Sequence, residues 1–149
     1  MKRIVVGPLG LGMILAGGLL AWWVGLPDSA WSGDACSLGT LRGTYMYNCH
    51  GVQGSAQTDF AIAGKEQFHG DGTVDGVNTF TDKDNVLHHV RYTADYTVNP
   101  NCTGSYTSTD ENGVVTHIDM FFPRDGSEID MIVTDPGVVD SLVERKVGR

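Results

Sequence analysis

Two ionisable side chains stand on otherwise apolar strand faces of this 149-residue chain, Glu66 and His88. Alternate residues around Glu66 are apolar, and so are those around His88. If these faces point inward, the two side chains share one cavity. A carboxylate and an imidazole in apolar surroundings have shifted pKa values suited to acid–base catalysis, such as a cyclisation or an isomerisation. Two alternatives stay open. Both side chains simply form hydrogen bonds at the barrel mouth, or the assignment of faces is displaced by one residue.

Seven more residues are predicted to line the same cavity and to contact a small apolar molecule. They are Phe60, Asn78, Tyr92, Tyr96, Tyr106, Met120 and Met131. Aromatic and methionine side chains at every second position are also typical of an ordinary core. We expect no cofactor, because the chain has no dinucleotide fingerprint, phosphate-binding glycine loop or nucleophile motif. We predict no metal site either, since His117 and Asp119 share a strand face without a third ligand at a recognisable spacing.

The candidate residues belong to a succession of short strands with period-two patterning. Val86–Val98 is the clearest, with alternating residues over its whole length, and Asn99-Pro100-Asn101 ends it. Tight-turn sequences such as Gly70-Asp71-Gly72 and Asn112-Gly113 separate other strands. The eight predicted strands are Gly43–His50, Phe60–His69, Thr73–Thr81, Val86–Val98, Cys102–Thr109, Val114–Phe122, Ser127–Thr134 and Val138–Val147.

The connections between these strands are too short for a crossover helix, so neighbours in sequence are expected to pair antiparallel. A meander of eight strands removes its exposed edges by closing on itself. The predicted fold is therefore all-β, an eight-stranded antiparallel up-and-down β-barrel. Such a barrel is filled by side chains or holds one small ligand. An open sandwich is the alternative.

The N-terminal segment is predicted to direct export. Lys2 and Arg3 precede Ile4–Leu26, which carries no charge, as in a signal peptide or a membrane anchor. The sequence does not separate a cleaved signal from a retained tether. We divide the chain into a signal or anchor segment, 1–35, and a barrel domain, 36–149. The barrel is then periplasmic, secreted or held at the outer face of the inner membrane. A net charge of −8 argues against nucleic acid as a partner.

Three cysteines in an exported domain predict one disulfide and one free thiol. Cys36 precedes the first strand and Cys102 opens the fifth, which places both at the same end of the barrel. Cys49 comes late in the first strand, near the opposite end. We therefore predict a Cys36–Cys102 disulfide and expect Cys49 to be a small buried hydrophobic residue.

Several short motifs resemble those of a bacterial family of exported proteins with the allene oxide cyclase barrel-like fold. The motifs are Cys36-Ser37-x-x-x-Leu41-x-Gly43-Thr44-Tyr45, Phe68-x-Gly70-x-Gly72-x-Val74-x-Gly76, Tyr96-Thr97-Val98-Asn99-Pro100-x-Cys102-Thr103-Gly104 and Thr134-Asp135-Pro136-Gly137. The family resembles plant cyclases that close a fatty-acid epoxide and barrel cyclases of polyketide pathways. No position matches the catalytic set of the plant enzymes.

Three functions follow as hypotheses. The first is a barrel that binds a small apolar or amphipathic molecule, and the second is a cofactor-free cyclase or isomerase in the same cavity. The third is a structural envelope protein whose barrel is packed solid.

Overall fold

The computed structural model describes residues 35–149, so the predicted signal or anchor segment lies outside the described residues. Within that range the chain forms one 3₁₀ helix and nine strands. The elements are η1 (Leu38–Thr40), β1 (Arg42–Gln53), β2 (Thr58–His69), β3 (Thr73–Asp82), β4 (Val86–Tyr96), β5 (Thr103–Asp110), β6 (Val115–Phe121), β7 (Glu128–Val133), β8 (Val138–Val139) and β9 (Ser141–Gly148). No helix among residues 35–149 has the length and hydropathy that a membrane span requires.

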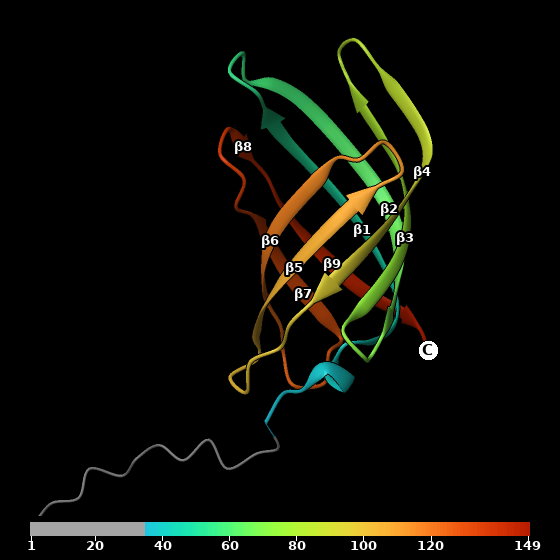
Figure 1. Cartoon of the computed structure of the whole chain (residues 1–149), viewed down its shortest axis with the longest axis vertical. Coiled ribbons are helices and arrows are strands. Elements are labelled where there is room, and N and C mark those ends of the chain that lie inside the picture. The colour runs from blue at the N-terminus through green and yellow to red at the C-terminus, as the bar shows by residue number, and fades with distance from the viewer. Residues whose placement is uncertain (1–34) are drawn as a thin grey trace, which may run out of the picture. The chain divides into compact units, whose positions relative to one another are not determined.

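The strands close into an antiparallel barrel (Figure 1). Consecutive strands pair from β1 to β7, β7 pairs with β9, and β9 returns to pair with β1. The two-residue strand β8 extends β9 along the end of β1, with Val139 opposite Val52. The predicted eight-stranded barrel is confirmed, and the open sandwich is wrong. The predicted strand Val138–Val147 is interrupted at Asp140, which separates β8 from β9.

One end of the barrel is filled by a dense core. Fully buried side chains from β1, β2, β6 and β7 meet there, and the segment before β1 folds across this end. The Tyr96 hydroxyl fixes that segment by sharing its one proton between the carbonyl oxygens of Leu38 and Leu41. Leu41 itself is completely buried. This end therefore offers no route into the interior.

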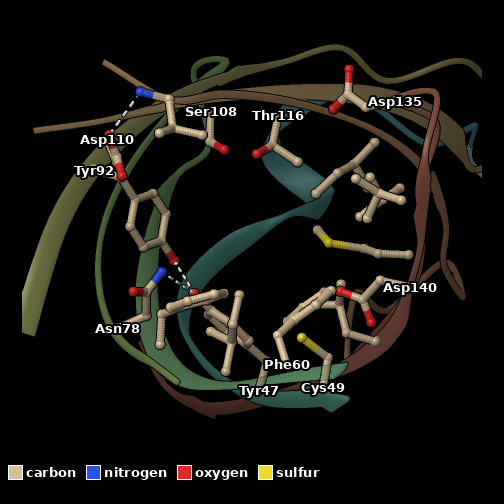
Figure 2. A pocket seen from close by; sticks show the side chains of 18 of the residues that line it. Tyr47, Cys49, Phe60, Asn78, Tyr92, Ser108, Asp110, Thr116, Asp135 and Asp140 are labelled. Atoms are coloured by element: carbon tan, nitrogen blue, oxygen red, sulfur yellow. Dashed lines mark hydrogen bonds between the residues drawn. The ribbon is translucent and has the colours of Figure 1, made fainter. Parts of the chain in front are cut away.

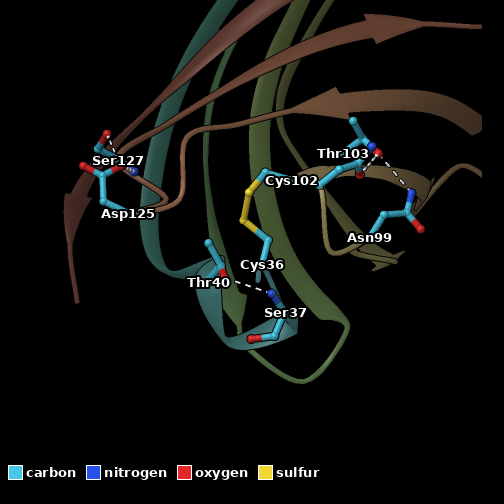
Figure 3. The surroundings of a disulfide bond; sticks show 9 residues. Cys36, Ser37, Thr40, Asn99, Cys102, Thr103, Asp125 and Ser127 are labelled. Carbon is cyan, nitrogen blue, oxygen red and sulfur yellow. Dashed lines mark hydrogen bonds between the residues drawn. A yellow bond between two sulfur atoms is a disulfide. The ribbon is translucent and has the colours of Figure 1, made fainter. Parts of the chain in front are cut away.

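A disulfide joins the closing segment to the barrel (Figure 3). Cys36 is bonded to Cys102, whose Cα lies 5.1 Å away, and the Cys36 amide donates to the Pro100 carbonyl. The predicted pairing is confirmed. Cys49 is the free thiol, as predicted, and it is only partly buried, less than the buried position expected of it.

A β-bulge changes which residues of β4 face inward. The pairing with β3 shifts between Asn78, opposite Val90, and Phe80, opposite Leu87. His89 takes a left-handed backbone conformation there, with a φ of 54°. The extra residue changes the alternation of inward and outward side chains in β4. The residues before His89 therefore point to the opposite face from the one that strict alternation with the rest of β4 predicts. Leu87 and Val90 both point inward, and His88 is exposed.

Candidate functional site

The other half of the barrel encloses a cavity of about 430 Å³ (Figure 2). Most of its lining is apolar or aromatic, and it extends to the turns after β1, β3, β5 and β7. Exposed apolar side chains at the end of the cavity form an apolar rim, made up of Leu87, Val114 and Val115. The cavity lies within the usual volume range of small-molecule sites. The interior is not packed solid, which argues against a filled structural barrel.

Glu66 stands in the wall of this cavity with two tyrosines bound to one of its oxygens. The hydroxyls of Tyr92 and Tyr106 each donate to Glu66 Oε2, both at 2.7 Å. Glu66 is 3% exposed. Burial raises the pKa of Glu66, and the hydrogen bonds from Glu144, Tyr106 and Tyr92 oppose that rise. The side chain is therefore held as a hydrogen-bond acceptor inside an apolar barrel.

A chain of donors leads to the same carboxylate. Because Tyr92 donates its only hydroxyl proton to Glu66, it accepts the 2.9 Å hydrogen bond from the Tyr47 hydroxyl. Tyr47 in turn accepts from Asn78 Nδ2 at 3.3 Å. Every donor in this chain is directed toward Glu66. Figure 2 shows Asn78, Tyr47 and Tyr92 meeting inside the barrel.

Glu144 is the second carboxyl group of the site. Glu66 and Glu144 lie opposite Tyr45 and Tyr47 respectively, on the two strands that flank β1. Glu144 is 1% exposed, and burial together with the charge of Glu66 and a hydrogen bond to it raises the pKa of Glu144 well above its usual range. Two buried carboxyl groups in contact cannot both ionise at low cost, so at least one of them holds a proton. Glu66 and Glu144 are called the carboxyl pair below.

The carboxyl pair is not saturated with hydrogen bonds. Glu66 Oε1 and Glu144 Oε2 have no donor among the described residues. A proton on either group supplies one hydrogen bond within the pair, and acceptor capacity remains beyond it. An acceptor left unpaired in an apolar interior is destabilising, and its usual partner is water or a ligand.

Asp140 is a third buried carboxyl group, nearer to the mouth. The residue is buried, with 7% of its surface exposed, yet its Oδ1 has no hydrogen-bond partner among the described residues. Burial raises the pKa of Asp140, and the hydrogen bond from the Cys49 thiol opposes the rise. Burial and then the hydrogen bond to Asp140 raise the pKa of Cys49 as well. Cys49 therefore stays a thiol at neutral pH and is a poor nucleophile.

A missing side chain makes room for part of the polar network. Tyr47 on β1 faces Gly64 on β2, and a Cβ at Gly64 would lie 2.8 Å from both Tyr47 Cζ and Asn78 Cβ. Only glycine lets the phenol ring lie across β2 and reach Asn78. The glycine in the strand interior thus positions the hydroxyl that binds Tyr92.

Most predicted cavity residues line the cavity, and three do not. Phe60, Glu66, Asn78, Tyr92, Tyr106 and Met131 are in its wall. Tyr96 and Met120 point inward but belong to the buried core at the closed end, so they do not line the cavity as predicted. The prediction that His88 points inward is also wrong, because the bulge at His89 leaves it exposed. Glu66 and His88 are therefore not brought together.

The partner that Glu66 does have was not predicted. Glu144 and Asp140 share a face of the last strand region with Leu142, while the opposite face carries Val143 and Val147. Hydrophobic alternation favours burying the valines, yet both are exposed. Period-two patterning thus selects the wrong face here, and no other pattern in the sequence identifies Glu144. Tyr47, by contrast, shares a predicted strand face with the buried Tyr45.

His117, one of the two residues considered for a surface metal, forms an ion pair with Asp135 instead. His117 Nδ1 lies 2.7 Å from Asp135 Oδ1, and the His117 amide donates to Asp135 Oδ2 at 2.8 Å. Both side chains therefore fix the turn after β7 against β6. Among residues 35–149, no three His, Cys, Asp or Glu side chains are grouped so as to hold a metal ion.

Fold and site together define a closed antiparallel β-barrel with one filled end and one hollow, partly carboxylate-lined end. The chain resembles solved structures of designed barrels. One is a de novo designed fluorescence-activating β-barrel, with a TM-score of 0.51 and 11% identity over 72% of this chain and 94% of that one. Another is a redesigned β-barrel bound to DFHBI, with a TM-score of 0.51 and 14% identity over 74% of this chain and 98% of that one. These likenesses show the fold. No protein-family model and no curated protein matches the chain.

Proposed function

We propose that the protein is an exported β-barrel that binds a small, largely apolar molecule in its interior. The observation that carries this proposal is the cavity of about 430 Å³, whose wall is mostly apolar and aromatic and includes a few buried polar groups. Ligand sites in proteins combine an apolar wall with a few convergent polar groups in this way. The redesigned barrel that this fold resembles is bound to the small molecule DFHBI, which is consistent with the proposal.

Export forms part of the same proposal. The Cys36–Cys102 disulfide is typical of oxidising compartments outside the cytoplasm. The charged start and uncharged run at Lys2–Leu26 support a signal or anchor segment over 1–35. We further propose membership of the allene oxide cyclase barrel-like family. Its motifs at Phe68–Gly76 and Tyr96–Gly104 fall in the turns that join β2 to β3 and β4 to β5.

Native mass spectrometry of the protein purified gently from its producing cell tests this function. We expect a mass increment from one bound small molecule, which is lost on denaturation. Equilibration with a lipid and polyketide extract should restore the increment. A protein that stays at its unliganded mass after both treatments would contradict the proposal.

A second candidate function is a cofactor-free cyclase or isomerase, and the carboxyl pair is the observation that favours it. A shared proton at the base of an apolar cavity supplies both a general acid and a general base. Turnover of epoxide or polyene substrates that is lost in Glu66→Gln, with affinity for the same compounds unchanged, would identify an enzyme. Binding without turnover in the wild-type protein would leave the binding function alone.

A further inference from the structure

The cavity is unusual in the sign of the charges that line it. Its acidic residues are Glu66, Asp110, Asp135, Asp140 and Glu144. Among the described residues that line it, none is lysine, arginine or histidine. No cationic side chain in the wall therefore balances the negative charge of a ligand carboxylate. An anion entering this interior of low polarity would also be repelled by several acidic groups.

The five acidic residues differ in what they already bind. Asp110 Oδ1 accepts from the backbone amides of Asn112 and Val114, which closes the turn after β5. Asp135 is bound by His117. The other three have the unpartnered oxygens Glu66 Oε1, Asp140 Oδ1 and Glu144 Oε2, and each of these side chains is more than nine-tenths buried. The cavity thus has buried acceptors to spare, and the donors in its wall, such as Ser108 and Thr116, are neutral.

The unpartnered acceptors stand at two depths. Strand β9 runs away from the mouth, and Asp140 and Glu144 are four residues apart on one face, which is about 13 Å along a strand. Asp140 is therefore near the apolar rim, and the carboxyl pair is at the base. The pair carries one negative charge when it holds one proton, and the donors of Tyr92 and Tyr106 support that charge on Glu66.

From this arrangement, and resting on the proposed function, we infer that the ligand is a hydrophobic amine bound as its ammonium ion. The ammonium group lies at the carboxyl pair, where it donates to Glu66 Oε1 and Glu144 Oε2. Its apolar tail extends past Phe60 and Val90 toward the apolar rim. An ammonium supplies three donors and a positive charge, which match unpartnered acceptors and one net negative charge. A fatty acid of equal size fits the apolar wall, but its carboxylate has neither the donors nor the positive charge.

Three ligands that differ only in their polar end test this inference. Octylamine, octan-1-ol and octanoate are titrated calorimetrically into the protein as purified, at neutral pH and about 0.15 M salt, where surface charge is screened. At this pH the amine is a cation and the acid an anion. We expect octylamine to bind at least about tenfold more tightly than octanol, as expected of a charge-assisted hydrogen bond. Octanoate should bind more weakly than octanol.

The double variant Glu66→Gln/Glu144→Gln removes the charge and keeps the side-chain volumes. We expect it to bind octylamine and octanol about equally, because the preference comes from the charge. The matched control is Asp59→Asn/Asp95→Asn, which removes two exposed carboxylates from the outer faces of β2 and β4. This control should keep the preference for the amine. Retained binding of octanol by the double variant shows that its cavity is intact.

The outcomes separate the inference from the proposed function. If none of the three compounds binds, the proposed function itself is contradicted. If octanoate binds as tightly as octylamine, or if the double variant keeps the preference for the amine, the barrel binds ligands but the inference is overturned. A further outcome is that Asp140→Asn loses the preference for octylamine over octanol while Glu66→Gln/Glu144→Gln keeps it. That result would place the ammonium at the mouth and overturn the assignment to the carboxyl pair.

Discussion

Gly76 and Tyr92 face each other across β3 and β4, and the phenol of Tyr92 occupies the space that any larger residue at 76 would need. A Cβ at Gly76 would lie 2.0 Å from Tyr92 Cζ and 2.3 Å from its hydroxyl oxygen. The ring lies across β3 in this way and reaches Glu66 on β2. The glycine is therefore a structural requirement of the carboxylate site.

Gly76→Ala should displace the Tyr92 ring and break its hydrogen bond to Glu66. Overpacking of this kind destabilises a fold by about 1–3 kcal/mol. Urea denaturation measures the loss, and the tyrosine absorption of the folded protein should change with it. Gly39→Ala is the matched control, because the nearest atom to its new Cβ is 3.8 Å away. Equal stability of the two variants would contradict this account of Gly76.

The stability of the barrel should fall as the pH rises from about 5 to 8. The pKa values of Glu66, Glu144 and Asp140 are raised in the folded protein, chiefly by burial. The folded state therefore binds more protons than the unfolded state. The stability that these groups contribute is fully present below the unfolded glutamate pKa of about 4.3 and is lost as the pH rises toward the folded values. Exposed aspartates with lowered pKa values, such as Asp71, change the stability only at lower pH, where they become protonated.

Unfolding free energies measured in urea at several pH values test this dependence. Glu144→Gln cannot ionise, so its stability should vary less with pH and exceed that of the wild-type protein at pH 8. Asp59→Asn, an exposed change on β2, should keep the wild-type slope. A Glu144→Gln variant whose stability follows the wild-type curve would show that the carboxyl pair does not hold a raised pKa.

Tyr106→Phe should weaken the site by removing one of the two hydroxyls that bind Glu66 Oε2. A hydrogen bond to a charged group contributes about 1.5–3 kcal/mol, and we expect a loss of this order in the unfolding free energy at neutral pH. The same substitution in a Glu66→Gln background should cost less, since the acceptor is then neutral. Additive effects of the two changes would mean that Tyr106 and Glu66 are not coupled.

The disulfide should contribute a large share of the stability. Cys36 and Cys102 are separated by 66 positions in sequence, and removing such a bridge costs about 2–5 kcal/mol. Cys36→Ser should lower the urea midpoint by a corresponding amount and leave two free thiols by mass spectrometry. In Cys49→Ser the bridge should remain and no thiol should react. A free Cys36 in that variant would contradict the assigned pairing.

The fold could be predicted because its signals are local. Alternating residues such as those of Val86–Val98 define strands, and turn residues such as Gly70 and Gly72 define how the strands are joined. Short connections then leave antiparallel neighbours as the natural arrangement. The disulfide follows from the same topology, since strand direction places Cys36 and Cys102 at one end.

The site was only half predictable, for two physical reasons. Glu66 lies on a strand face with a clear apolar pattern, so its inward orientation could be inferred. His88 precedes a bulge at His89 that reverses the alternation, and no residue type in Leu87–Val90 indicates the bulge. Glu144 lies on the more polar face of β9, and the barrel buries that face while it exposes Val143 and Val147.

The central claim is that the hollow end of the barrel binds a ligand, and a dye titration on two variants tests it most directly. Val133 lines the cavity and the neighbouring Ile132 is exposed on the outer face of β7. Val133→Phe fills the cavity, whereas Ile132→Phe adds the same ring outside. Nile red, a neutral dye, should bind the wild-type protein and Ile132→Phe at one saturable site and bind Val133→Phe at least about tenfold more weakly. Equal binding by all three proteins would show that the dye, and with it the proposed ligand, does not enter the barrel.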